Sequence, residues 1–265
     1  MIYGLNNEYL NLIAGDMSSD VVNKKTPKPS IELVQKAFDK MNIPIIVDGD
    51  FGSGSRQAWQ FFQRSYPDKS NIKNLKSEID KDGLILMDRA LQDSWTFNYD
   101  EPEWIDTAKG EIGVKENPSL DKSNPRIEEY YKAAGFTWAG DDSLGRNAWC
   151  GCYVAWVLKS NGLPIVKSSY RAKEWLDYGI TLDKPVLGSI GVKSRVGGGH
   201  VGFVVGQSGD GEYIYLLGGN QDNSVKVSRY SKIGFEAFVF PDGQLSEFNE
   251  LPLYIKKANK VRSEL

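Results

Sequence analysis

Apolar residues at helical spacing dominate the N-terminal third of the chain. The predicted helices span residues 31–42, with Ser30 as the N-cap, then 53–64, and more weakly 84–94. The second helix carries an aromatic stripe that contains Trp59, Phe61 and Phe62. These elements indicate a small all-α domain of three helices over residues 1–98, with its core at 30–95.

Beyond residue 98 the pattern changes from helices to short strands. The predicted helices are 104–110, 126–134 and 148–159, and the predicted strands are 189–193, 200–207, 212–217, 225–230 and 235–240. Turns rich in Gly, Asp and Ser separate the strands. Helices followed by strands indicate an α+β domain with a mostly antiparallel sheet. We expect this domain to cover residues 99–265, with its core at 103–241.

Composition narrows the possible functions. The 32 basic and 35 acidic residues leave a net charge of −3, which gives no basic field to attract nucleic acid. Two cysteines rule out a disulfide scaffold, and a single histidine rules out most His-rich metal sites. We therefore expect no metal and no other cofactor. No apolar run is long enough to predict stable insertion into a membrane.

Cys150 lies in the first turn of the helix predicted over residues 148–159. The N-terminal end of a helix favours an anion, so it lowers the pKa of a thiol and raises the thiolate fraction. Cys152 lies about 200° further around the helix, so the two sulfurs cannot enter one site. Cys150 is therefore the candidate nucleophile and Cys152 the alternative, although a lone cysteine in a helix is usually a small buried hydrophobe.

The only histidine, His200, begins the most apolar strand, directly after three glycines at 197–199. If the strands 200–207 and 212–217 form a hairpin, Asn220 and His200 finish near the same end of the sheet. An amide there would hold the imidazole in one tautomer, as the third member of a Cys–His–Asn set. Taken singly, His200 is more typical of a surface residue and Asn220 of a turn.

The sequence motifs around these three residues resemble those of the CHAP/NlpC-like cysteine peptidoglycan hydrolases. They are NAWCGCYVAW around Cys150, GHVGFVVG around His200 and LGGNQ around Asn220. The resemblance covers residues 103–241 and implies a papain-like fold that cleaves amide bonds in wall peptides. It also implies that Cys150 is the nucleophile, His200 the general base and then acid, and Asn220 the orienting residue. Many CHAP enzymes carry Glu at the position of Gly218, so here Gln221 is a candidate for an assisting role.

The N-terminal helices resemble the three-helix peptidoglycan-binding domain, through LVQKAF at 33–38, VDGDFG at 47–52 and FFQ at 61–63. In that family the DGxFG loop and the next helix form a shallow wall-binding groove. The resemblance implies that the wall-binding residues are Asp48, Asp50, Phe51, Arg56 and Gln63. The same motif also has a purely structural interpretation, in which Asp48 shapes a turn and Phe51 fills a core. As a calcium loop it fails, because the later acidic ligands are missing.

Together these features predict a modular, endolysin-like peptidoglycan hydrolase that acts as a monomer on the polymeric wall. The chain begins without the features of a signal peptide, so we expect synthesis in the cytoplasm of a phage-infected host and action on the wall after release. A secretion-system effector or a bacterial wall-remodelling enzyme would share this architecture. Two other classes of function stay open: a muramidase that uses Glu111 or Glu116, and a non-catalytic wall-binding or virion structural protein.

Overall fold

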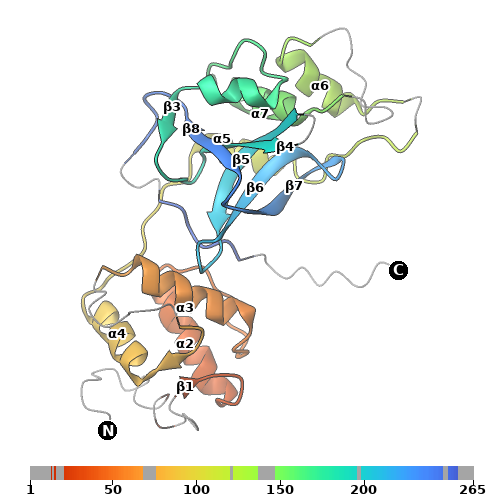
Figure 1. Ribbon diagram of the computed structural model, residues 1–265. Helices are drawn as coiled ribbons and strands as arrows, with labels where there is room; N and C mark the ends of the chain where they lie inside the picture. Colours follow the sequence, from red (N-terminus) through yellow and green to blue (C-terminus); the bar gives the residue numbers. More distant parts are fainter. Residues whose placement is uncertain are drawn as a thin grey trace. The chain divides into compact units, whose positions relative to one another are not determined.

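The computed structural model describes residues 13, 15, 21–67, 76–119, 122–136, 147–195, 198–246 and 250–255. Contacts divide the chain into two compact units (Figure 1). The first comprises Met1–Asn98 with Ser208–Gly211 and Pro252–Leu265, and the second comprises Tyr99–Gln207 with Glu212–Leu251. None of the helices in the described ranges has the length and apolar content needed to cross a membrane.

Over its residues 21–67 and 76–98, the first unit contains three helices and a short pair of strands. They are β1 (Val21–Val22), α2 (Lys28–Lys40), α3 (Ser53–Ser65), β2 (Ile79–Asp80) and α4 (Lys81–Gln92). Phe62 is the centre of the core: its ring stacks on Trp59 at 5.7 Å and on Tyr66 at 5.3 Å, and meets Trp95 edge-on. The aromatic stripe predicted on α3 therefore becomes the packing face of this unit.

Two local details of the first unit differ from the sequence-based prediction. Helix α2 begins at Lys28 with Pro27 as its N-cap residue, so Ser30 is a buried residue of the first turn and not the cap. Proline suits the first turn of a helix because its φ is already helical and it lacks an N–H. The β1–β2 pair was not predicted, because strands of two residues are too short to show alternation.

The second unit has a mixed α+β fold, which confirms the expected fold class. Its elements are α5 (Glu103–Gly110), α6 (Pro125–Ala133), α7 (Cys150–Ser160), the 3-10 helix η2 (Ala172–Asp177), β3 (Ile180–Leu182), β4 (Ile190–Arg195), β5 (Gly198–Gln207), β6 (Tyr213–Gln221), β7 (Ser224–Ser231) and β8 (Phe235–Phe240). The sheet has the order β3-β8-β4-β5-β6-β7, and all its pairs are antiparallel.

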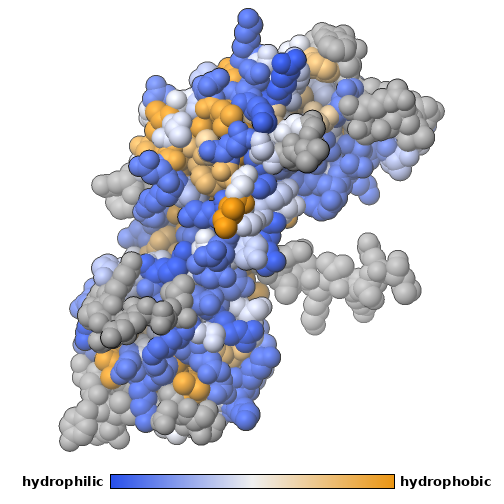
Figure 2. All heavy atoms as spheres, in the orientation of Figure 1, coloured by the Kyte–Doolittle hydropathy of each residue, from blue (hydrophilic) through white to orange (hydrophobic). Residues whose placement is uncertain are grey.

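Both faces of this sheet carry buried side chains. Helix α7 packs on one face, where the Tyr153 ring meets Phe203 at 6.2 Å, and α6 lies beside α7 (Figure 1). The other face holds a buried cluster that includes Val204, Leu216 and Leu251. Most of the surface seen in Figure 2 is hydrophilic, as expected for units that bury their apolar residues inside.

Strand β6 is longer than predicted and is irregular where it ends. It continues to Gln221, and its register with β7 shifts between Gly218 and Gln221. Asp222 and Asn223, which have φ of 45° and 58°, then connect β6 to β7. Two residues of positive φ form the tight hairpin turn whose twist suits antiparallel strands. The elements η2 and β3 were not predicted.

Candidate active site

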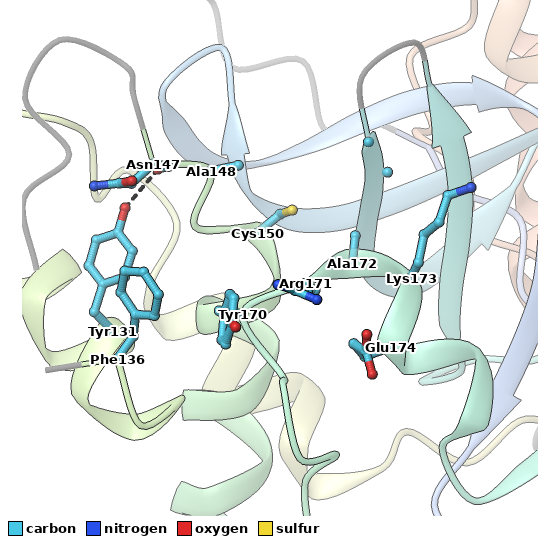
Figure 3. Close-up of a pocket in the computed structure, with 12 residues that line it drawn as sticks. Tyr131, Phe136, Asn147, Ala148, Cys150, Tyr170, Arg171, Ala172, Lys173 and Glu174 are labelled. Atoms are coloured by element: carbon cyan, nitrogen blue, oxygen red, sulfur yellow. Dashed lines mark hydrogen bonds between the residues drawn. The ribbon is translucent and has the colours of Figure 1, made fainter. Parts of the chain in front are cut away.

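A pocket of about 540 Å³ opens in the second unit (Figure 3). Its walls come from four segments that are far apart in sequence: the end of α6 with Phe136, residues 147–150, residues 170–174 and residues 198–199. In Figure 3 the rings of Tyr131, Phe136 and Tyr170 lie on one side of Cys150, and Ala172 and Lys173 lie on the other. The pocket therefore has an aromatic side and a charged side.

Cys150 lies in this pocket as the first residue of α7. Trp149 is the N-cap residue, and its backbone carbonyl accepts the Tyr153 N–H at 3.0 Å. The Cys150 residue is only 1% exposed, and its thiol is not part of a disulfide. At a helix start, the unsatisfied N–H groups and the helix dipole stabilise a thiolate. Among the three predicted catalytic residues, Cys150 is thus the one that lines this pocket.

Cys152, the alternative nucleophile, is completely buried. Burial raises the pKa of its thiol, and the neighbouring Cys150 raises it further. A buried thiol that stays protonated is a poor nucleophile. The geometry therefore favours Cys150 over Cys152.

His200 lies near the start of β5, opposite Lys193 of β4, and is 7% exposed. Gly199, directly before it, lines the pocket of Cys150. A Cβ added at Gly199 would lie 3.1 Å from the Cβ of Ala172, so the 170–174 segment passes close to the strand there. His200 itself is not among the residues that line the pocket. The lining of the pocket therefore reaches Gly199, the residue directly before His200.

The His200 side chain lies near the end of β6. A Cβ added at Gly218 would lie 3.4 Å from Nε2 of His200 and also 3.4 Å from Nε2 of Gln221. Gln221 is buried, and its Oε1 accepts the Tyr230 hydroxyl at 2.7 Å. The Tyr230 ring centre is 5.7 Å from that of His200. Gln221 thus lies beside the space that a longer side chain at position 218 would occupy.

Asn220 occupies the irregular end of β6 with a φ of 57°, in the left-handed region that Asn tolerates better than most residues. Beside it, a Cβ on Gly219 would lie 2.5 Å from the Trp149 ring, so β6 and the start of α7 approach closely here. The ladder between β5 and β6 confirms that the strands of His200 and Asn220 are neighbours. The catalytic roles of Cys150, His200 and Asn220 stay predictions.

The two carboxylates considered for a muramidase both have structural partners. Glu111 is buried and receives two hydrogen bonds from Arg126, each of 2.7 Å, and another from the Tyr130 hydroxyl. The hydrogen bonds from Arg126 lower the pKa of Glu111, so it is ionised and unsuited to donate a proton. Glu116 accepts the indole N–H of Trp149 at 2.8 Å. Neither contact favours glycosidase chemistry.

The candidate wall-binding residues of the first unit divide into buried and exposed ones. Phe51 is 1% exposed and Gln63 is 2% exposed, so both side chains are buried, although Phe51 also lines a pocket with Arg56; their role in wall binding stays a prediction. Asp48 and Asp50 are exposed in the loop, and Asp48 accepts a hydrogen bond from Gln35 at 2.8 Å. The hydrogen bond from the Asp50 N–H contributes most to lowering the pKa of Asp48.

Arg56 follows this loop in α3 and is partly exposed. Its guanidinium donates to the Phe51 carbonyl at 3.2 Å. It also lines a pocket of about 380 Å³ together with Lys24 and Lys25. Asp48, Asp50 and Arg56 therefore keep surface that a ligand could reach, and their role in wall binding stays a prediction.

The 170–174 segment is the part of the site that was not predicted from the sequence. It has no periodicity, because it leaves a turn and enters the short helix η2. One signal was present: Gly151, directly after Cys150, is a glycine inside a helix, and such a glycine often marks a close backbone contact. Its partner in that contact is this segment.

A buried thiol at a helix start, facing a pocket, is the kind of site that cysteine hydrolases use. Residues 141–220 match the family model of the CHAP domain. The match begins before Cys150 and ends at Asn220, and it supports assignment to a CHAP peptidoglycan hydrolase family. Hydrolase activity of the amidase or peptidase type, with peptidoglycan as the substrate, is what this family implies. No curated protein and no solved structure matches the chain.

Proposed function

We propose that this protein is a modular peptidoglycan hydrolase that cleaves an amide bond in the peptide part of the bacterial cell wall. The observation that carries the proposal is the Cys150 thiol, placed at the start of α7 and in a pocket, within the CHAP match. The bond is either the one between the sugar lactyl group and the first stem residue, or one within the stem or cross-link. The same chemistry serves both.

In the proposed mechanism the Cys150 thiolate attacks the carbonyl carbon of the scissile amide. The Cys150 N–H and a neighbouring donor stabilise the oxyanion that forms. His200 gives its proton to the leaving amine as the C–N bond breaks, which leaves a thioester. His200 then takes a proton from water, and attack of the hydroxide on the thioester releases the peptide acid and restores the Cys150 thiolate beside a protonated His200. Asn220 orients the imidazole, and Gln221 assists.

The first unit would act as the wall-binding module and hold the enzyme on its polymeric substrate. Tethering raises the effective concentration of scissile bonds near the catalytic unit. The biological setting that we propose is that of a phage endolysin, made in the host cytoplasm and released to the wall.

The test is digestion of purified peptidoglycan, with the released fragments identified by mass spectrometry. We compare the wild type with Cys150→Ala, Cys150→Ser, His200→Ala and the matched control Cys152→Ala. General acid–base catalysis is worth about 10²–10⁴-fold, so His200→Ala should be nearly as inactive as Cys150→Ala. Cys152→Ala should digest the wall, because its thiol is buried outside the pocket.

Each outcome decides something. New amine and carboxyl ends on the fragments would identify the cleaved bond. Digestion by Cys150→Ala would refute the thiol mechanism, and new reducing sugar ends would redirect the search to carboxylates. Wall binding without digestion by the wild type would favour a non-catalytic binding protein.

A further inference from the structure

The charged side of the Cys150 pocket is formed by Arg171, Lys173 and Glu174, within the segment of residues 170–174 that we call the 170–174 wall. This wall enters η2 and presents Arg171, Lys173 and Glu174 along the pocket (Figure 3). Its position follows from close contacts with the residues next to Cys150 and His200.

The first contact joins the wall to the helix of Cys150. A Cβ added at Gly151 would lie 2.2 Å from the Ser169 carbonyl oxygen and 2.9 Å from the Tyr170 carbonyl oxygen. The backbone therefore approaches α7 at the residue directly after Cys150, at a distance that only glycine allows. The indole N–H of the buried Trp175 also donates to the Ser169 carbonyl at 2.8 Å. The backbone at the start of the 170–174 wall is thus held by Gly151 on one side and by the Trp175 indole on the other.

The second contact joins the wall to the strand of His200. Ala172 lies against Gly199, where a Cβ would be 3.1 Å from the Ala172 Cβ. Arg171 lies between the two contacts, since one anchors residues 169–170 and the other anchors Ala172. A side chain at position 171 is therefore presented beside the reacting centre by a backbone held at both ends.

The charges along the wall are not equivalent. Lys173 has its ammonium 3.5 Å from a carboxylate oxygen of Glu236, so its charge is partly compensated. The Arg171 guanidinium lies 5.4 Å from the centre of the Tyr170 ring, and among the described residues it forms an ion pair with no carboxylate. Glu174 is partly buried on the same wall. Arg171 is thus the cation best placed to meet an anionic substrate.

We infer that Arg171 binds a free carboxylate of the wall peptide beside the scissile amide, so that this enzyme selects substrates carrying that carboxylate over amidated ones. A guanidinium matches a carboxylate through two parallel hydrogen bonds, which an ammonium cannot reproduce. The aromatic side of the pocket would receive the apolar part of the peptide, because the rings of Phe136 and Tyr170, whose centres are 4.8 Å apart, both line it. This inference rests on the proposed function.

The experiment compares two substrates: purified peptidoglycan and the same peptidoglycan after its carboxylates have been converted to carboxamides. The kcat/KM for each is measured with the wild type, Arg171→Ala, Arg171→Lys, Glu174→Gln and the control Lys167→Ala. Lys167 is exposed and does not line the pocket. We expect the kcat/KM of the wild type to be about 10-fold higher on the untreated peptidoglycan than on the amidated one. This is the effect of one charge-assisted contact at a solvent-exposed site.

Arg171→Ala should lose this preference, because its kcat/KM on the untreated peptidoglycan should fall toward the value for the amidated one. Arg171→Lys should retain only part of the preference. Glu174→Gln should retain it or increase it, and Lys167→Ala should match the wild type. The preference should also weaken at high salt, because solvent-exposed charges are screened.

Two results would overturn the inference and leave the proposed function intact: an equal preference in Arg171→Ala and the wild type, or no preference in the wild type. Binding provides a second measurement. Calorimetry with the Cys150→Ala protein and soluble wall peptides, free or amidated, should show the same Arg171-dependent difference in Kd. Failure of the wild type to cleave either wall would refute the proposed function itself.

Discussion

Substituting Gly151 by alanine tests whether the close approach between α7 and the 170–174 wall builds the site. The added Cβ would lie 2.2 Å from the Ser169 carbonyl oxygen, whereas ordinary contacts begin at 3.4 Å. The two backbones must therefore separate by at least 0.8 Å to reach 3.0 Å, below which real Cβ contacts are essentially never seen, and by 1.2 Å to reach ordinary contact. Because the nearest atoms belong to backbone, no side chain can rotate to relieve the overlap.

The expected effect on stability is small, since two terms oppose each other. Overpacking lowers the free energy of unfolding by about 1–3 kcal/mol, and replacing glycine by alanine inside a helix raises it by up to about 1 kcal/mol. The unfolding free energy should fall by about 1 kcal/mol, which lowers Tm by about 2–4 °C in a unit of this size. The effect on catalysis should be much larger, because a misplacement of about 1 Å can reduce the rate by about 10²-fold.

The assay pairs thermal unfolding with kcat/KM on purified peptidoglycan. Gly110→Ala is the matched control: this glycine is also helical, lies in the same unit, and has open space where a Cβ would be placed. Gly110→Ala should keep full activity and unfold at the same temperature or slightly higher. Wild-type activity in Gly151→Ala would refute the reasoning, because the position of the 170–174 wall would then not affect catalysis. A large loss of Tm would show that the contact serves stability instead.

Two further predictions concern the surroundings of the site. Tyr230→Phe removes the hydroxyl that Oε1 of the buried Gln221 accepts, so the unfolding free energy measured in urea should fall by about 1–3 kcal/mol, and kcat should fall if Gln221 helps to position His200. Wild-type values of both would contradict this role. Glu111 has its pKa lowered by hydrogen bonds from Arg126, so its stabilisation is complete above its ordinary value of 4.5 and is lost as the pH falls through the folded-state pKa. Urea unfolding from pH 7 to pH 3 should show a loss of stability in the wild type that Glu111→Gln lacks, and parallel curves would contradict the prediction.

Local sequence features predicted most helices and strands to within a few residues. Helix α6 begins at Pro125 after the cap residue Asn124, whose side chain accepts the Arg126 N–H, as a proline at a helix start indicates. Helix α3 extends over Ser53–Ser65, close to the predicted 53–64. Such elements are predictable because periodicity and capping depend on residues within one or two turns of each other.

Elements that depend on distant partners were not predictable in this way. Strand β3 has three residues and exists through its pairing with β8, nearly sixty residues later. The end of β6 runs past Leu217 because the hairpin turn at residues 222–223 continues its pairing with β7. Short segments carry too few residues to show a period, so their structure is decided by the neighbours on which they pack.

The features of the candidate site also fall into those that local sequence predicts and those that depend on distant contacts. The sequence by itself determined that Cys150 lies at a helix start and that His200 and Asn220 lie on adjacent strands, because each conclusion rests on local order and turn chemistry. Only the tertiary structure decided that Cys152 is buried, that Phe51 and Gln63 are buried, and that the 170–174 wall lies beside Cys150. Burial and close backbone approach are properties of residues that meet across the fold, and no pattern within a single segment determines which residues those are.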